Sequence, residues 1–67
     1  MRENSTPTAE DLGLGELNST AEVSRALGVP ENTIRWWRHI GRLPALRVGR
    51  RLRFRRDDVM ALIEVAE

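Results

Sequence analysis

The spacing of apolar residues predicts a first helix near position 20. Apolar side chains there recur at i, i+3 and i+4, the spacing of one helix face, and these are Val23, Ala26 and Leu27. Ser19 and Glu22 have the spacing of a capping box, in which each side chain accepts a hydrogen bond from the other residue's backbone amide. Gly28 follows as a C-terminal stop. The pattern therefore predicts a helix over residues 20–27.

The segment "VPENTIRWWRHIG" predicts a second helix directly after the first. Pro30 suits a first helical position, and Glu31 suits the positive end of the helix dipole. Gly41 ends the helix, and a three-residue turn over 28–30 separates it from the first. Two helices joined in this way form a helix-turn-helix, whose second helix can enter the major groove of DNA.

After residue 44, apolar residues recur at every second position and no longer with the spacing of a helix, which indicates β-strands. Leu46 and Val48, and then Leu52 and Phe54, alternate with arginines. The dipeptide Gly49-Arg50 lies between the two runs and predicts the turn of a β-hairpin.

A third helix is predicted after the hairpin, with Asp57 or Asp58 as its cap. Its apolar face consists of Val59, Leu62, Ile63 and Ala66. At the other end of the chain, residues 1–16 are polar and broken by proline and glycine, so we expect a flexible tail. Leu12, Leu14 and Leu17 alternate, which allows the end of this tail to pack as a short extended piece.

Two adjacent tryptophans, Trp36 and Trp37, must point in different directions, because neighbours on a helix are about 100° apart. Trp37 falls near the middle of the apolar arc and is predicted to be core. Trp36 falls at the edge, beside the basic face. It can be a half-buried boundary residue next to Ile40, a flat contact on DNA, or both. The predicted core is Val23, Leu27, Ile34, Trp37, Phe54, Val59 and Leu62.

The composition excludes several classes of protein. A chain of 67 residues is one small domain, and without cysteine it has neither a disulfide nor a zinc finger. His39 is the only histidine, and it has no nucleophile beside it in the sequence, so we expect no metal, cofactor or catalytic residue. We see no signal peptide and no apolar run of membrane length, and therefore expect a cytoplasmic protein with no membrane partner.

The net charge of +1 conceals a strong segregation of charge along the chain. Residues 1–32 carry −4, residues 33–56 carry nine arginines and no acid, and residues 57–67 carry −4. Such a block has a polyanion as its natural partner. All eleven basic residues are arginine, which suits bidentate contacts to phosphate and guanine, although a GC-rich genome gives the same bias. The alternatives are a merely solvated basic face and an adaptor that binds an acidic protein.

The order helix, turn, helix, basic hairpin, helix, together with local motifs, resembles the excisionase family of winged helix-turn-helix proteins, related to the MerR DNA-binding domain. The matching strings are Leu27-Gly28-Val29, Thr33 to Trp37, Gly41 to Pro44, Val48 to Arg50, Arg53 to Arg55 and Asp58-Val59. The resemblance covers residues 17–66. It implies a mostly α fold with three helices and a two-stranded wing, over residues 17–67. Two positions depart from the family pattern: Trp36 replaces a basic residue, and Pro30 replaces a serine N-cap.

The resemblance also implies which residues face DNA. The second helix would present Asn32, Thr33, Arg35, Trp36 and His39 to the major groove. Arg50, after the wing glycine, would enter the minor groove, with Arg51 and Arg53 on the backbone. The full predicted DNA-binding set is Asn32, Thr33, Arg35, Trp36, Arg38, His39, Arg47, Arg50, Arg51 and Arg53.

Excisionases bind and bend prophage attachment sites, often in cooperative rows, and direct a tyrosine integrase toward excision. The resemblance implies the same role here, in the cytoplasm of a bacterial host and on its nucleoid. No dimerisation helix follows the third helix in this sequence, so we expect a protein that is monomeric when free and that contacts neighbouring copies on DNA. The alternative is a small phage or plasmid transcriptional regulator of the same fold.

Overall fold

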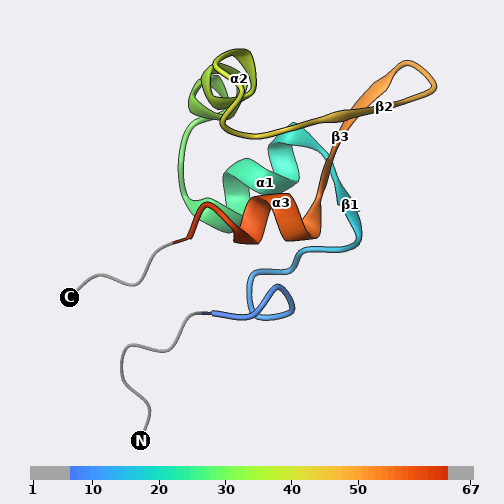
Figure 1. The fold of residues 1–67 in the computed structure, drawn as a ribbon. Coiled ribbons are helices and arrows are strands. Elements are labelled where there is room, and N and C mark those ends of the chain that lie inside the picture. Colours follow the sequence, from blue (N-terminus) through green and yellow to red (C-terminus); the bar gives the residue numbers. More distant parts are fainter. Residues whose placement is uncertain (1–6, 64–67) are drawn as a thin grey trace, which may run out of the picture.

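The computed structural model describes residues 7–63, which form a winged helix-turn-helix (Figure 1). Three helices and a small antiparallel sheet are present, as the sequence predicted. The elements are β1 (Leu17–Asn18), α1 (Thr20–Leu27), α2 (Glu31–His39), β2 (Leu46–Val48), β3 (Arg51–Arg55) and α3 (Arg56–Met60).

The first helix, α1, has the predicted bounds and the predicted caps. The Glu22 amide donates to the Ser19 hydroxyl at 3.1 Å, and the Ser19 amide donates to the Glu22 carboxylate at 2.7 Å. Gly28 ends the helix in the left-handed conformation with φ 70°, where a side chain would be strained. These signals are local in sequence, and they set both ends of α1.

The capping box makes the stability of the fold depend on pH. The hydrogen bond from the Ser19 amide lowers the pKa of Glu22 below its ordinary value, and the positive charges of Arg53 and Arg25 act in the same direction. A carboxyl group with a lowered pKa in the folded state stabilises the fold above its unfolded pKa, and this contribution is lost as the pH falls through the folded pKa. We therefore expect Glu22→Gln to lower the melting temperature at neutral pH. In thermal melts at successively lower pH, the difference from the wild type should shrink and vanish as the pH falls through the lowered pKa of Glu22.

A tight turn sets α2 against α1. The amides of Gly28 and Val29 both donate to the Ser24 carbonyl, at 2.9 and 3.2 Å, and the Ser24 hydroxyl donates to the Val29 carbonyl. Pro30 then precedes α2 in an extended conformation and supplies no side-chain cap. Its carbonyl instead accepts from the Thr33 amide at 3.0 Å and begins the helical hydrogen bonds.

The end of α2 turns the chain back toward the core. Gly41 takes a positive φ of 80°, and the Trp37 carbonyl accepts from the amides of Arg42 and Leu43, at 2.8 and 3.1 Å. This reversal places Leu43 in the core with no exposed surface. The sequence prediction of the core did not include Leu43.

The predicted hairpin is present, and a third strand extends it. β2 and β3 pair antiparallel, with Leu46 opposite Arg53 and Val48 opposite Arg51, and Gly49-Arg50 forms the turn. β1 pairs with the other edge of β3, which gives the order β1-β3-β2. The segment around Leu17 is therefore extended and packed, as the leucine alternation allowed.

Asn18 fastens the segment before α1 to the sheet. Its side chain is 1% exposed, yet its polar atoms are satisfied. The Gly15 amide donates to Asn18 Oδ1 at 2.9 Å, and Asn18 Nδ2 donates to the carbonyls of Gly15 and Phe54, at 2.9 and 3.3 Å. A buried amide with these partners holds β1 in one register against β3.

The third helix begins earlier than predicted and has a different cap. Arg55 is the N-cap residue, and no side chain caps the helix, so the prediction of Asp57 or Asp58 as the cap was wrong. The physical reason is that β3 runs directly into α3, and the Arg56 amide donates to the Glu16 carbonyl at 3.0 Å. Asp57 and Asp58 lie in the first turn, where their charge favours the helix dipole. Ala66 lies outside the described residues.

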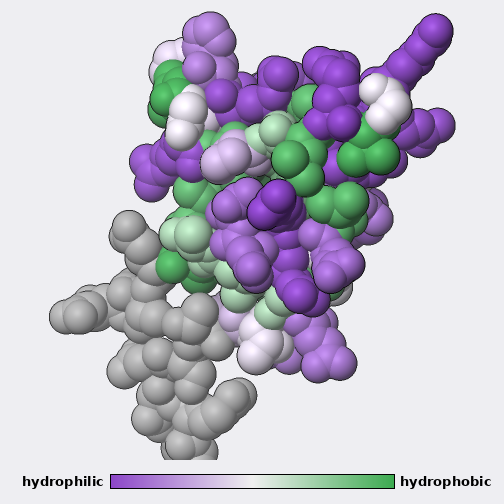
Figure 2. All heavy atoms as spheres, turned by 45° about the vertical axis from the view of Figure 1, so that its right-hand side comes forward, coloured by the Kyte–Doolittle hydropathy of each residue, from purple (hydrophilic) through white to green (hydrophobic). Residues whose placement is uncertain are grey.

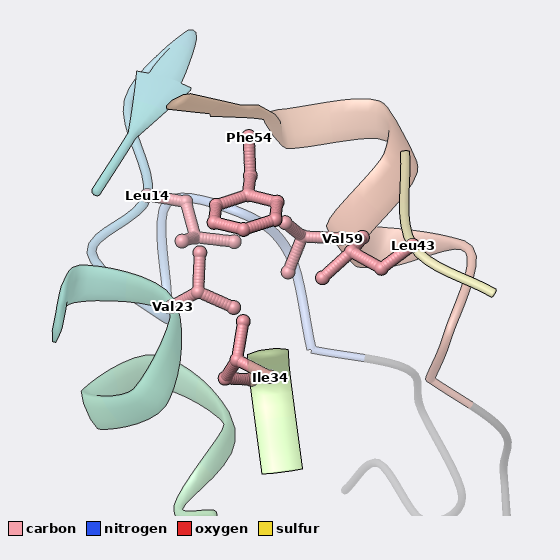
Figure 3. Close-up of a cluster of buried hydrophobic side chains, with 6 residues drawn as sticks. All are labelled: Leu14, Val23, Ile34, Leu43, Phe54 and Val59. Carbon is pink, nitrogen blue, oxygen red and sulfur yellow. The ribbon is translucent and has the colours of Figure 1, made fainter. Parts of the chain in front are cut away.

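Six apolar side chains from different elements meet in the core (Figure 3). They are Leu14, Val23, Ile34, Leu43, Phe54 and Val59. The other three predicted core residues, Leu27, Trp37 and Leu62, are partly buried and pack around this cluster. Leu14 is a correction to the predicted tail: residues 9–14 form a hydrogen-bonded turn that carries Leu14 into the core. The flexible tail stays a prediction for residues 1–6, which lie outside the described residues.

Candidate nucleic-acid interface

The second helix and the hairpin lie at the same end of the molecule. In Figure 1 both are at the top, whereas the turn formed by residues 9–13 lies at the bottom. Figure 2 shows that hydrophilic residues cover much of this upper end. We call the exposed side chains of α2, of Arg42 in the turn after it, and of residues 47–51 the basic face.

The two tryptophans of α2 lie in different surroundings. Trp37 is partly buried and packs against the core, and the Arg42 guanidinium lies 5.8 Å from the centre of its ring. Trp36 is 56% exposed. Ile40, the C-cap residue of α2, is 49% exposed.

The outward face of α2 carries most of the residues predicted to contact DNA. Ile34 is buried on the inward face of this helix. Thr33 is partly buried, at the boundary between the two faces. The exposed residues are Asn32, Arg35, Trp36, Arg38 and His39.

Arg35 is held in place by its own helix. Its guanidinium donates to the Glu31 carboxylate at 3.1 Å and to Asn32 Oδ1 at 2.9 Å. All three side chains lie at the surface or at its edge, so the ion pair contributes little stability, about 0.2–0.5 kcal/mol. Its main effect is to orient Arg35 and Asn32 together. Sequence reasoning counted Arg35 as a free cation and missed its pairing with Glu31.

Trp36 and His39 form a second ordered pair on the same face. Their ring centres are 5.8 Å apart, and the rings are tilted by 33°. Residues three apart on a helix are surface neighbours, so this contact follows from the helical spacing. The contact restricts the orientation of the exposed indole.

The hairpin presents arginines on its outer surface. Arg47, Arg50 and Arg51 are exposed, and Gly49 with φ 63° makes the tight turn from which Arg50 projects. Arg53 is placed differently from the expectation that it points toward phosphate or solvent. It is partly buried, its guanidinium donates to the Leu52 carbonyl at 2.8 Å, and its charge acts on Glu22 of α1.

The basic face is largely uncompensated. In the part of the chain that the structure describes, ion pairs join Arg35 to Glu31, at 3.1 Å, and Arg56 to Asp57, at 4.0 Å. Five exposed arginines of α2, its following turn and residues 47–51 are in neither pair: Arg38, Arg42, Arg47, Arg50 and Arg51. Their charges therefore add up to a positive field at one end of the molecule.

Two other kinds of feature, a cluster of metal ligands and a membrane-spanning helix, are not found in residues 7–63. No group of three or more histidine, aspartate or glutamate side chains there could hold a metal ion. Nor does that stretch contain a helix of the length and apolarity needed to cross a membrane.

Comparisons with known proteins agree with this geometry. Residues 19–64 match a family model described as a helix-turn-helix domain. The transcriptional repressor DcmR of Methylorubrum extorquens (strain DSM 6343 / CIP 106787 / DM4) is 39% identical over 54 residues. That match covers 78% of this chain but 20% of the repressor, so the chain spans about a fifth of the length of this relative. No solved structure matches. The family match covers more than half of the chain, and the chain therefore belongs to the helix-turn-helix domain family of DNA-binding proteins.

Proposed function

We propose that the protein binds specific sites in double-stranded DNA with the basic face, placing α2 in the major groove and the hairpin on the flanking backbone and minor groove. The observation that supports this most strongly is the position of five arginines, outside any ion pair, on two elements at one end of the molecule. An α-helix fits the width of the major groove, and arginines on both sides can reach phosphates. The proposed contact residues of α2 are Asn32, Thr33, Arg35, Trp36, Arg38 and His39.

In this proposal, some arginines of the hairpin contact the minor groove and others contact the phosphate backbone. Arg50 enters the minor groove, whose narrow A·T-rich form attracts a guanidinium. Arg47 and Arg51 bind phosphates, and Arg53 contributes less because it is partly buried against Leu52. The two kinds of contact differ in their dependence on sequence, which makes them separable by mutation.

We expect Arg50→Ala to weaken binding to the cognate site by about 1–3 kcal/mol and to lessen the preference for A·T pairs under the wing. Arg51→Ala is the matched control, because Arg51 is the next residue, is also exposed, and carries the same charge. It should weaken all sequences alike. Fluorescence anisotropy on the cognate duplex and on one with G·C pairs under the wing compares the two. Equal losses for both variants on both duplexes would contradict the special role of Arg50.

For the biological role, we propose an excisionase that binds and bends attachment-site DNA and directs a tyrosine integrase toward prophage excision. The resemblance of residues 17–66 to that family supports this role. The second candidate is a transcriptional regulator in a phage or plasmid, which the similarity to the repressor DcmR supports. Both roles place the protein on bacterial DNA in the cytoplasm, without catalytic residues of its own.

Two assays on the same DNA separate these roles. An excision assay with a candidate tyrosine integrase should yield excised circles only when the protein is added, if it is an excisionase. A promoter fusion carrying the selected binding site should change its output instead, if it is a regulator. Excision that proceeds equally well without the protein, combined with a changed promoter output, would contradict the excisionase role.

We further propose that copies bind side by side on DNA. The sequence separates an acidic part, with a charge of −4 over residues 1–32, from a basic part, with +9 over residues 33–56, so neighbours in a row can make contacts of opposite charge. Such contacts are weak until DNA holds both copies close together. We expect a monomer in sedimentation at micromolar concentration and cooperative binding to tandem sites. A stable dimer without DNA would contradict this proposal.

A further inference from the structure

An exposed apolar patch lies at the C-terminal end of α2, beside the basic face. Trp36 is 56% exposed and Ile40, one turn later, is 49% exposed. A single exposed apolar side chain is ordinary, whereas two of them one turn apart beside a cationic surface indicate a contact site. Phosphate groups do not bind to an apolar surface. The binding of phosphates by the arginines therefore does not explain why these apolar side chains are exposed.

The charged residues near the patch indicate which kind of molecule contacts it. Trp36 lies on the same outward face as Asn32 and Arg35, whose side chains are joined by a hydrogen bond of 2.9 Å. A polyanion drawn to these charges brings its own surface onto Trp36. In the major groove of DNA, the apolar group displayed on base edges is the C5 methyl of thymine.

The orientation of the Trp36 indole is also restricted before any such contact forms. His39 packs beside it with ring centres 5.8 Å apart, which restricts its rotation. Arg35 and Asn32 are joined to each other on the adjacent part of the face. An ordered aromatic group loses little conformational entropy on binding, which favours its use as a specificity residue.

We propose that Trp36 determines part of the sequence specificity by packing against thymine methyl groups in the major groove, with His39 as its positioning residue. This rests on the proposed function, since it requires α2 to lie in that groove. It gives Trp36 a role in base recognition at a position where the related family commonly has a basic residue. Asn32 and Arg35 would then make the hydrogen bonds to the polar groups on the base edges.

The test begins with a duplex selected from a random pool by the wild-type protein. Each thymine in it is then replaced by uracil, which removes only the methyl group. We expect one or two replacements under α2 to weaken wild-type binding about fourfold each, the effect of losing one buried methyl group. The same replacements should have no effect on Trp36→Ala, while Trp36→Phe should keep part of the sensitivity. Arg51→Ala is the control and should keep all of it, despite weaker overall binding.

Several outcomes would overturn the inference while the proposed function stands. One is that the wild type binds DNA in a salt-sensitive way but no uracil replacement alters its affinity. The same holds if the selected site has no thymine under α2. Another is a uracil effect of the same size in Trp36→Ala, since a different side chain would then contact the methyl group. A third is a Trp36→Ala protein that binds single sites normally and loses only cooperativity on tandem sites, which would make Trp36 a contact between proteins. Failure to select or bind any duplex would instead contradict the proposed function itself.

Discussion

Replacing Phe54 with alanine should unfold most of the protein. Phe54 is 1% exposed at the centre of the core, on the middle strand of the sheet (Figure 3). Removing a buried phenylalanine ring costs about 3–5 kcal/mol, and a domain of this size has a total stability of roughly 3–10 kcal/mol. The substitution should therefore consume much or all of the free energy of unfolding. Urea denaturation followed by circular dichroism measures this loss.

The matched control for Phe54→Ala is Val48→Ala in the neighbouring strand of the hairpin. Val48 is 51% exposed, so its truncation should cost less than about 1 kcal/mol. If the two variants lost similar stability, the core would not be centred where the six buried side chains place it.

Raising the salt concentration should weaken DNA binding by orders of magnitude. The five arginines of the basic face outside ion pairs are all exposed, and each can displace a counterion from the DNA, Arg50 in the minor groove and the others at phosphates. About five such contacts give a slope of roughly −4.5 in log affinity against log salt. From about 50 to about 200 mM salt, affinity should then fall about 500-fold. Fluorescence anisotropy titrations with one duplex at several salt concentrations give the slope.

A double variant tests whether these particular arginines produce the salt dependence. Arg47→Ala with Arg51→Ala should reduce the slope by about two, because two phosphate contacts are lost. As the control, Arg53→Ala should change it less, since Arg53 is partly buried and bonded to the Leu52 carbonyl. A slope near zero in the wild type would contradict the proposal that the arginines bind phosphates.

The parts of the fold that follow from local chemistry could be predicted from the sequence. The bounds of α1 depend on the Ser19–Glu22 capping box and on Gly28, all within ten residues. The hairpin turn depends likewise on Gly49-Arg50, between two runs of period two. In each case the residues that decide the structure are neighbours in the sequence, so their pattern is sufficient.

The parts that depend on long-range packing could not be predicted. Leu43 enters the core only because the chain reverses after Gly41, and Asn18 is buried because Phe54, far along the chain, offers it a carbonyl. The cap of α3 was wrong for a similar reason, since β3 joins the helix directly and its first amide bonds to Glu16. These outcomes depend on which elements become neighbours in space.

In the candidate site, too, features set by local helix geometry could be predicted, whereas side-chain pairings could not. Helical spacing predicted which tryptophan of α2 points outward, because that depends only on the helix period. Charge counting could not predict that Arg35 bonds to Glu31 and Asn32, or that Arg53 lies against its own strand. Such pairings decide which arginines remain available to DNA.

The most direct test of DNA binding by α2 and the hairpin is a nuclear magnetic resonance titration of the labelled protein with its selected duplex. The account predicts that amide shifts concentrate in residues 32–39 and 47–51, and that residues 8–13 and α3 change little. Shifts concentrated in α3 and residues 8–13, with α2 and the hairpin unchanged, would contradict it.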